Sequence, residues 1–267
     1  MDELRVVLEL ATEDELQDLT EILFRRKFNP LDYLQGLDPI HVARRNRAQW
    51  LDAIEDRFRF LAADGFTVLK GGSHAVTYRQ VLVRVCRHLK LKFSPLLSTT
   101  DIEAEIFLHL MERAWKNIPA KDRRDLVQRI GEALQQSTSE PLPLTCNSEP
   151  LRLMVEGGSA LAFSSVMRPI VLRQIARQFA LYFSTYQSAA HLSGSLLVQA
   201  ARQGAASTAL RYATTRSLFA ALSSALWIGF AVDLGWRAIA TNYGRIIPII
   251  FTLAQIRLTR SEWAYAT

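Results

Sequence analysis

The chain has 267 residues, of which 49% are hydrophobic and 22% are charged, and its net charge is +6. This length can bury a core of ordinary size without cross-links, and the two cysteines, Cys86 and Cys146, argue against a disulfide-built secreted scaffold. The chain opens with Met1, Asp2 and Glu3 rather than with a basic segment followed by an apolar one. We therefore expect an intracellular, cytoplasmic protein.

The first half of the chain predicts short amphipathic helices and no strand. Thr12 with Glu15, and Thr100 with Glu103, have the spacing of a capping box, in which each side chain satisfies a free backbone N–H at a helix start. Apolar residues then recur at helical intervals. We expect helices over residues 12–27, 41–63, 73–91, 100–118 and 119–136.

A composition change near the middle predicts a domain boundary. Residues 137–150 contain three prolines among small polar residues, as linkers do. We expect an all-α protein with a helical bundle domain over residues 1–136, a linker over residues 137–150, and a basic, apolar helical region over residues 151–267. The first of these should fold by itself as a soluble unit.

Charge is distributed unevenly between the two halves. Residues 1–150 hold 21 Lys and Arg against 23 Asp and Glu, whereas residues 151–267 hold 11 cations, all of them Arg, against 3 acids. A region with an excess of positive charge attracts anionic surfaces.

Three stretches of the second half, residues 178–201, 217–232 and 246–256, carry no charged residue. A membrane-spanning helix needs about 20 mainly apolar residues. The first stretch is too polar, and the other two are too short. We expect instead helices that lie at the bilayer surface, as monotopic or peripheral elements, or a buried apolar helix pair. An all-apolar helix such as residues 246–258 has to be covered by either lipid or protein.

A basic amphipathic helix is expected over residues 167–183, with Arg side chains on its polar side, and it suits an anionic headgroup layer. The expected lipid or anionic-surface contacts are Arg168, Arg173, Arg177, Arg211, Arg216, Arg237 and Arg245. Interfacial aromatic residues are expected at Trp227, Trp236, Tyr243 and Trp263. Nucleic acid is the less favoured partner, because its binders place cations on otherwise polar modules.

Motifs of the common enzyme classes are missing: there is no phosphate loop, dinucleotide fingerprint, zinc-protease helix or nucleophile elbow. Glu105 and His109 lie four residues apart, a spacing that could orient an imidazole, but a structural pair is the favoured interpretation. The Gly71-Gly72 turn could receive an anion at a helix start, although a plain turn is favoured. We expect no catalytic residues, no metal and no cofactor.

The segment from Tyr78 to Trp115 resembles the core of the YaaW-type family of uncharacterised bacterial proteins. The resemblance is carried by a Gly turn, a Tyr-Arg helix start, a Lys-Leu-Lys helix end and an acidic helix that closes on Trp-Lys; the matching residues include Gly71, Tyr78, Arg79, Lys90, Lys92, Glu103 and Trp115. Residues 4–23 and 244–258 are also similar to that family. A distant link to the ubiquinol-cytochrome c chaperones implies a helical, chaperone-like assembly role at a membrane.

The resulting expectation is a non-catalytic scaffold or assembly factor at the inner or an internal membrane, with a membrane surface or a membrane protein complex as its partner. A homo-oligomer is compatible with this expectation. One alternative is a lipid-inserting or membrane-remodelling protein. Another is an enzyme with an unfamiliar helical site around Glu105, His109 and the Gly71-Gly72 turn.

Overall fold

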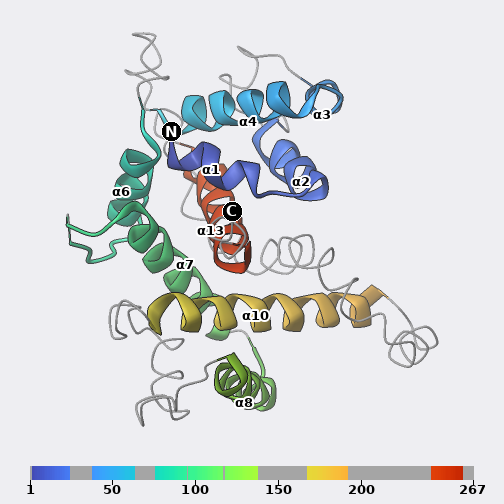
Figure 1. Cartoon of the computed structure of the whole chain (residues 1–267), viewed down its shortest axis with the longest axis vertical. Coiled ribbons are helices and arrows are strands. Elements are labelled where there is room, and N and C mark those ends of the chain that lie inside the picture. Colours follow the sequence, from blue (N-terminus) through green and yellow to red (C-terminus); the bar gives the residue numbers. More distant parts are fainter. Residues whose placement is uncertain are drawn as a thin grey trace. The chain divides into compact units, whose positions relative to one another are not determined.

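The computed structural model describes residues 2–24, 38–63, 76–94, 96–116, 118–137, 167–191 and 242–260. These residues form nine helices and no strand, which confirms the predicted all-α fold (Figure 1). No helix among them is both long enough and apolar enough to cross a bilayer.

The first two helices begin where local capping predicts. α1 (Glu3–Glu9) starts at Asp2, whose carboxylate accepts from Leu4 N. α2 (Glu13–Phe24) is preceded by the predicted capping box, because Thr12 N donates to Glu15 Oε2 at 2.8 Å and Glu15 N donates to Thr12 Oγ1 at 3.3 Å. The start predicted at Thr12 is thus confirmed to within one residue.

The single helix predicted over residues 41–63 is instead two, α3 (Pro39–Ala43) and α4 (Arg47–Ala62). Asn46 separates them, since its backbone is extended and its side chain accepts from Gln49 N at 2.9 Å. An Asn side chain competes for the backbone in this way and favours a new helix start over continuation.

α6 (Tyr78–His88) starts with a capping box between Thr77 and Gln80. α7 (Thr99–Lys116) is followed by α8 (Ala120–Ser137). The capping box predicted at Thr100 and Glu103 is wrong: Asp101 N donates to Ser98 Oγ at 3.1 Å, so α7 begins earlier. Glu103 consequently lies inside the helix, and its carboxylate accepts from Tyr78 and Arg257 rather than from the helix start.

The remaining described helices are α10 (Met167–His191) and α13 (Tyr243–Arg260). The chain forms two compact units, one of residues Met1–Ile106 with Gly229–Arg257, and one of residues Phe107–Ile228 with Leu258–Thr267. These units cross the expected division at residues 137–150, because α13 belongs with the N-terminal helices. Residues 138–150 lie outside the described part.

α13 is the core helix of the first unit. Every residue from Gly244 to Ile256 is buried, and Figure 1 shows α13 beside α1. Its N-terminal end is held by Asn242 N, which donates to the Leu61 carbonyl at 3.1 Å, and by Tyr243, whose ring stacks on His88 with centroids 3.9 Å apart. The sequence predicts that this apolar segment is covered by either lipid or protein, and in the structure protein covers it.

Arginines from other helices cap the C-terminal ends of helices in the first unit. Arg47 Nη2 donates to the carbonyl of Glu9, the last residue of α1, at 3.1 Å, and Arg84 Nη1 donates to the Ala62 carbonyl at the end of α4, at 3.2 Å. The last carbonyls of a helix lack partners within it and carry its partial negative charge. These cations therefore join helices rather than cover a surface.

In the second unit, α10 packs against α8, and Figure 1 shows α10 along its length with α8 seen nearly end-on. Its buried face consists of Val171, Leu172, Gln174, Ile175, Ala176, Phe179 and Ala180. Tyr182 donates to Asp122 Oδ2 at 2.9 Å and ties the two helices together. Trp115, at the end of α7, packs against Phe179 with ring centroids 5.8 Å apart.

Candidate functional site

The arginines expected to form one polar strip on α10 lie at different angles around it. Arg177 is exposed, and Arg173, four residues earlier, is half-buried on the same side. At 100° per residue, Arg168 lies about 180° from Arg177, on the side that packs against protein. Over residues 168–182 the apolar face of α10 is covered by protein, while Arg168 and Arg173 are half-buried and Arg177 is exposed.

Two like charges at helical spacing disfavour each other. Burial, and then the charge of Arg177, lowers the pKa of the Arg173 guanidinium. An anion at this place would relieve the repulsion.

Arg245, expected at an anionic surface, is instead fully buried. Its Nη1 donates to the Leu23 carbonyl at 3.3 Å, and the Nε of Arg57 donates to the same carbonyl at 3.2 Å. Two buried cations thus cap the end of α2, where the helix dipole is negative. The expected surface role of Arg245 is replaced by a structural one.

Tyr243, expected as an interfacial aromatic residue, stacks on His88 within the first unit. Several other expected site residues lie outside the described part of the chain: Gly71, Arg211, Arg216, Trp227, Trp236, Arg237 and Trp263.

The structure brings together two residues of the resemblance motif and one that the motif did not single out. Tyr78 Oη donates to Glu103 Oε2 at 3.0 Å, and Arg257 Nε donates to Glu103 Oε1 at 3.2 Å. Arg257 Nη2 also donates to the Glu3 carbonyl at 3.1 Å. This network connects α1, α6, α7 and α13.

The network is buried, with Tyr78 1% and Glu103 2% exposed. Burial raises the pKa of Glu103 above its usual value, and Arg257 opposes that rise. Burial, followed by the charge of Glu103, raises the pKa of the Tyr78 hydroxyl well above its usual value. Both oxygens of Glu103 are engaged, so the network joins helices.

Each residue of the pair considered for an enzyme site has another neighbour, Glu112 for His109 and Cys86 for Glu105. His109 Nδ1 lies 3.9 Å from Glu112 Oε2, and burial lowers the pKa of the imidazole. Glu105 instead raises the pKa of Cys86, although burial is the larger cause. Within the described ranges, no three His, Cys, Asp or Glu side chains gather as metal ligands would.

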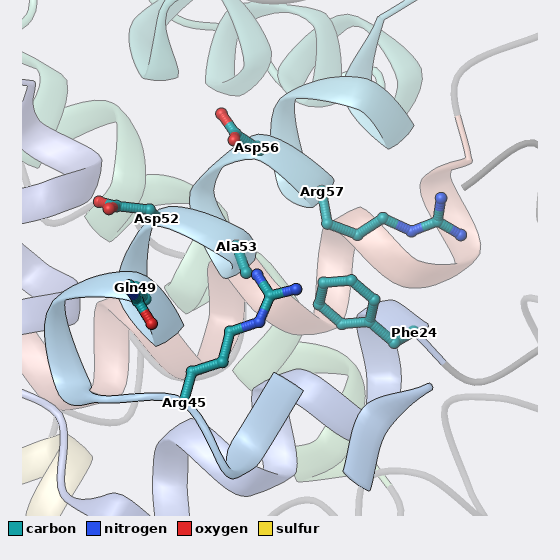
Figure 2. A pocket seen from close by; sticks show the side chains of 7 residues that line it. All are labelled: Phe24, Arg45, Gln49, Asp52, Ala53, Asp56 and Arg57. Carbon is teal, nitrogen blue, oxygen red and sulfur yellow. The ribbon is translucent and has the colours of Figure 1, made fainter. Parts of the chain in front are cut away.

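A pocket of about 630 Å³ lies at the end of α2 and along α4. It is lined by Phe24, Arg45, Gln49, Asp52, Ala53, Asp56 and Arg57. In Figure 2 the Asp52 and Asp56 carboxylates point to one side and the Arg57 guanidinium to the other. Asp52 also pairs with Arg5 Nη1 at 2.5 Å. The Asp52 and Asp56 carboxylates point away from the Arg57 guanidinium, so these three groups do not surround one reacting atom.

The most distinctive exposed feature is the end of α6 and its connection to α7, described over residues 87–94 and 96–98, which we call the basic turn. α6 ends in a Schellman motif: Leu91 N donates to the Cys86 carbonyl at 2.9 Å, and Lys90 N donates to the Arg87 carbonyl at 3.2 Å. Lys90 occupies the left-handed position of this motif, with φ of 58°, where Gly is usual. The motif turns the chain sharply.

The basic turn is rich in positive charge. Arg87, Lys90 and Lys92 are all exposed, and none of them forms an ion pair with another described residue. No Asp or Glu occurs anywhere from residue 65 to residue 100. Two of these cations, Lys90 and Lys92, belong to the resemblance motif, whereas its Arg79 is half-buried and its Trp115 is buried in the second unit.

Comparison with family models, with curated proteins and with solved structures finds no match to this chain. The candidate surface therefore stands on geometry and charge alone.

Proposed function

We propose that the protein is a non-catalytic helical interaction or assembly factor that works at an anionic membrane surface. The observation that carries the proposal is the basic turn, with three exposed cations and no Asp or Glu from residue 65 to residue 100. The acid that follows, Asp101, accepts from Ser98 Oγ at 2.7 Å. Each Lys or Arg near an anionic bilayer contributes about 1 kcal/mol of attraction. Three such residues contribute about 3 kcal/mol, a factor of roughly one hundred in the binding constant.

The described helices support a scaffold role. A buried network of ionisable side chains joins four helices and consists of Tyr78, Glu103 and Arg257. A rigid unit held in this way can present a surface turn in a constant orientation. Such presentation is what an assembly factor needs, and it agrees with the role that the YaaW-type resemblance implies.

The test is binding of the full-length protein to phosphatidylcholine vesicles with and without phosphatidylglycerol, measured by co-sedimentation. Arg87, Lys90 and Lys92 are replaced together by Gln. A loss of about 3 kcal/mol corresponds to a binding constant weaker by about two orders of magnitude. The matched control replaces three exposed cations of α8, Lys121, Arg124 and Arg129, by Gln.

The proposal predicts that the control binds nearly as well as the wild type and that binding weakens as salt is raised. Equal losses in the two triple variants would show that only total charge matters. If the wild-type protein does not co-sediment with anionic vesicles, the proposal is excluded. For the enzyme alternative, His109→Ala should leave binding and any cellular phenotype unchanged, and loss of the phenotype with folding intact would favour catalysis.

A further inference from the structure

The basic turn carries an apolar side chain that the protein leaves almost uncovered. Leu96 is 94% exposed, more than any other large apolar residue among those described. Two local hydrogen bonds support this conformation: Leu96 N donates to Ser94 Oγ at 3.3 Å, and Leu97 N donates to the Ser94 carbonyl at 3.2 Å. At this exposure the Leu96 side chain contributes almost no apolar burial to the folded chain.

We propose that Leu96 is an apolar anchor that inserts into the acyl boundary of an anionic bilayer while the cations of the basic turn stay at the headgroups. This inference rests on the membrane-surface function proposed above and specifies how that same site engages lipid. It makes the turn a monotopic element rather than a purely electrostatic one.

The order of residues along the turn suits a bilayer. Lys90 and Lys92 are exposed and precede Leu96 by six and four residues. Phe93, which lies between Lys92 and Leu96, and Leu97, which follows Leu96, are half-exposed. Long Lys side chains extend their ammonium groups to headgroups while their stems and neighbouring apolar residues lie deeper. An anionic bilayer offers a plane of headgroups that attracts the cations and, directly beneath it, an apolar layer that can bury Leu96.

An acidic protein partner matches only one of these features. Its carboxylates would pair with Lys90 and Lys92, but nothing in such pairing calls for a leucine at 94% exposure. The two partners also differ in their response to salt, because electrostatic attraction is screened at high ionic strength whereas apolar burial is not. Residual binding at high salt therefore measures the contribution of the anchor.

The experiment compares full-length wild type with Leu96→Ser on phosphatidylcholine vesicles containing phosphatidylglycerol, at low and at high salt. Burial of one leucine side chain corresponds to a roughly tenfold to hundredfold change in the binding constant. We expect a loss of that size for Leu96→Ser at both salt concentrations. The matched control is Ile40→Ser, which removes another exposed apolar residue, 61% exposed, on α3.

A second measurement reports insertion directly. An environment-sensitive fluorophore is attached to Leu96→Cys in a Cys146→Ser background, where the remaining Cys86 is buried and its thiol is not reactive. The emission should shift to the blue on addition of anionic vesicles, and lipids brominated near the headgroup end of their chains should quench it. A label at exposed Asp125 should show neither change.

The outcomes separate the two proposals. If the wild type fails to bind anionic vesicles, the membrane-surface function itself is excluded. If the wild type binds, but Leu96→Ser binds equally well or the label stays in water, the anchor is excluded and the recruitment is electrostatic. Equal losses in Leu96→Ser and Ile40→Ser would likewise overturn the assignment to the basic turn. Binding that persists at high salt and is weakened by Leu96→Ser but not by Ile40→Ser supports the anchor.

Discussion

Arg257, near the end of the last described helix, donates through Nε to the carboxylate of Glu103, which lies 154 residues earlier in the chain, at 3.2 Å. The guanidinium is mostly covered, with 16% of its side chain exposed, and the carboxylate side chain is 2% exposed. A buried pair of this kind adds little compared with an apolar pair, yet removal of one partner leaves a buried charge. The pair therefore keeps α13 in register with α7.

The first prediction is that Arg257→Met destabilises the first unit by about 3 kcal/mol near neutral pH, because Glu103 is left as an uncompensated buried carboxylate. Urea unfolding followed by circular dichroism measures the change. The double variant Arg257→Met, Glu103→Leu should recover much of the loss, since no buried charge remains. A single variant as stable as the exposed control Arg129→Met would contradict the buried-pair interpretation.

The second prediction concerns pH. Burial raises the pKa of Glu103 in the folded protein above its usual value of 4.5, so the folded state binds the proton more readily than the unfolded state. The stability from this group is fully present below the usual pKa and is lost as pH rises through the raised value. Stability curves of wild type and Glu103→Gln should thus diverge on raising the pH from about 4, with the wild type losing more. Parallel curves would refute the raised pKa.

The third prediction is that the Cys86 thiol is inert while the protein is folded. Burial, and secondarily Glu105, raises the pKa of this thiol to about 12, and the thiolate is the reactive form. In a Cys146→Ser variant, Ellman's reagent at about pH 8 should react only at the rate of unfolding. Guanidinium chloride should make the reaction immediate. Fast labelling in native buffer would show that the site opens.

The fourth prediction separates stability from binding at Lys90. A residue with a Cβ in the left-handed region costs about 1 kcal/mol relative to Gly. Lys90→Gly should therefore raise the midpoint of thermal unfolding while vesicle binding weakens about fivefold through loss of one charge. Lys90→Val should lose both stability and binding. A Lys90→Gly protein with unchanged or lower stability would contradict the strained conformation.

Local signals in the sequence explain what could be predicted. The capping box of Thr12 and Glu15 involves residues three apart, so the start of α2 was accessible to pattern analysis. Asn46 is a known helix-start residue, but the continuous apolar periodicity on both sides of it hid the break between α3 and α4. Similarly, Ser98 and Thr100 both fit an N-terminal cap, and only the neighbouring helices decide between them.

The site residues were harder to predict because an arginine in a sequence does not reveal its partner. Arg245 caps the end of α2 and Arg257 pairs with Glu103, and both partners lie more than a hundred residues away. The apolar segment that these two arginines flank could equally have met lipid, since burial by either removes the same surface from water. The exposed Leu96 was missed because nothing local distinguishes it from a core leucine.

The last prediction follows from the place of α13 in the first unit. The sequence predicts that residues 1–136 fold alone, but seven large apolar side chains of α13 are buried in the first unit: Ile246, Ile247, Ile249, Ile250, Phe251, Leu253 and Ile256. At about 1.5–3 kcal/mol each, their burial amounts to roughly 10–20 kcal/mol, as much as the whole stability of an ordinary domain. A fragment of residues 1–137 should therefore lack a cooperative unfolding transition and should bind apolar dyes.

Co-expression with residues 242–260 on a soluble carrier should restore the transition, because that segment supplies Arg245, Arg257 and the apolar residues of α13. The matched control carries Arg257→Met in the co-expressed segment and should restore it less well, in line with the loss of the ion pair with Glu103. If residues 1–137 unfold cooperatively without the added segment, then α13 is an accessory to the first unit and not its core.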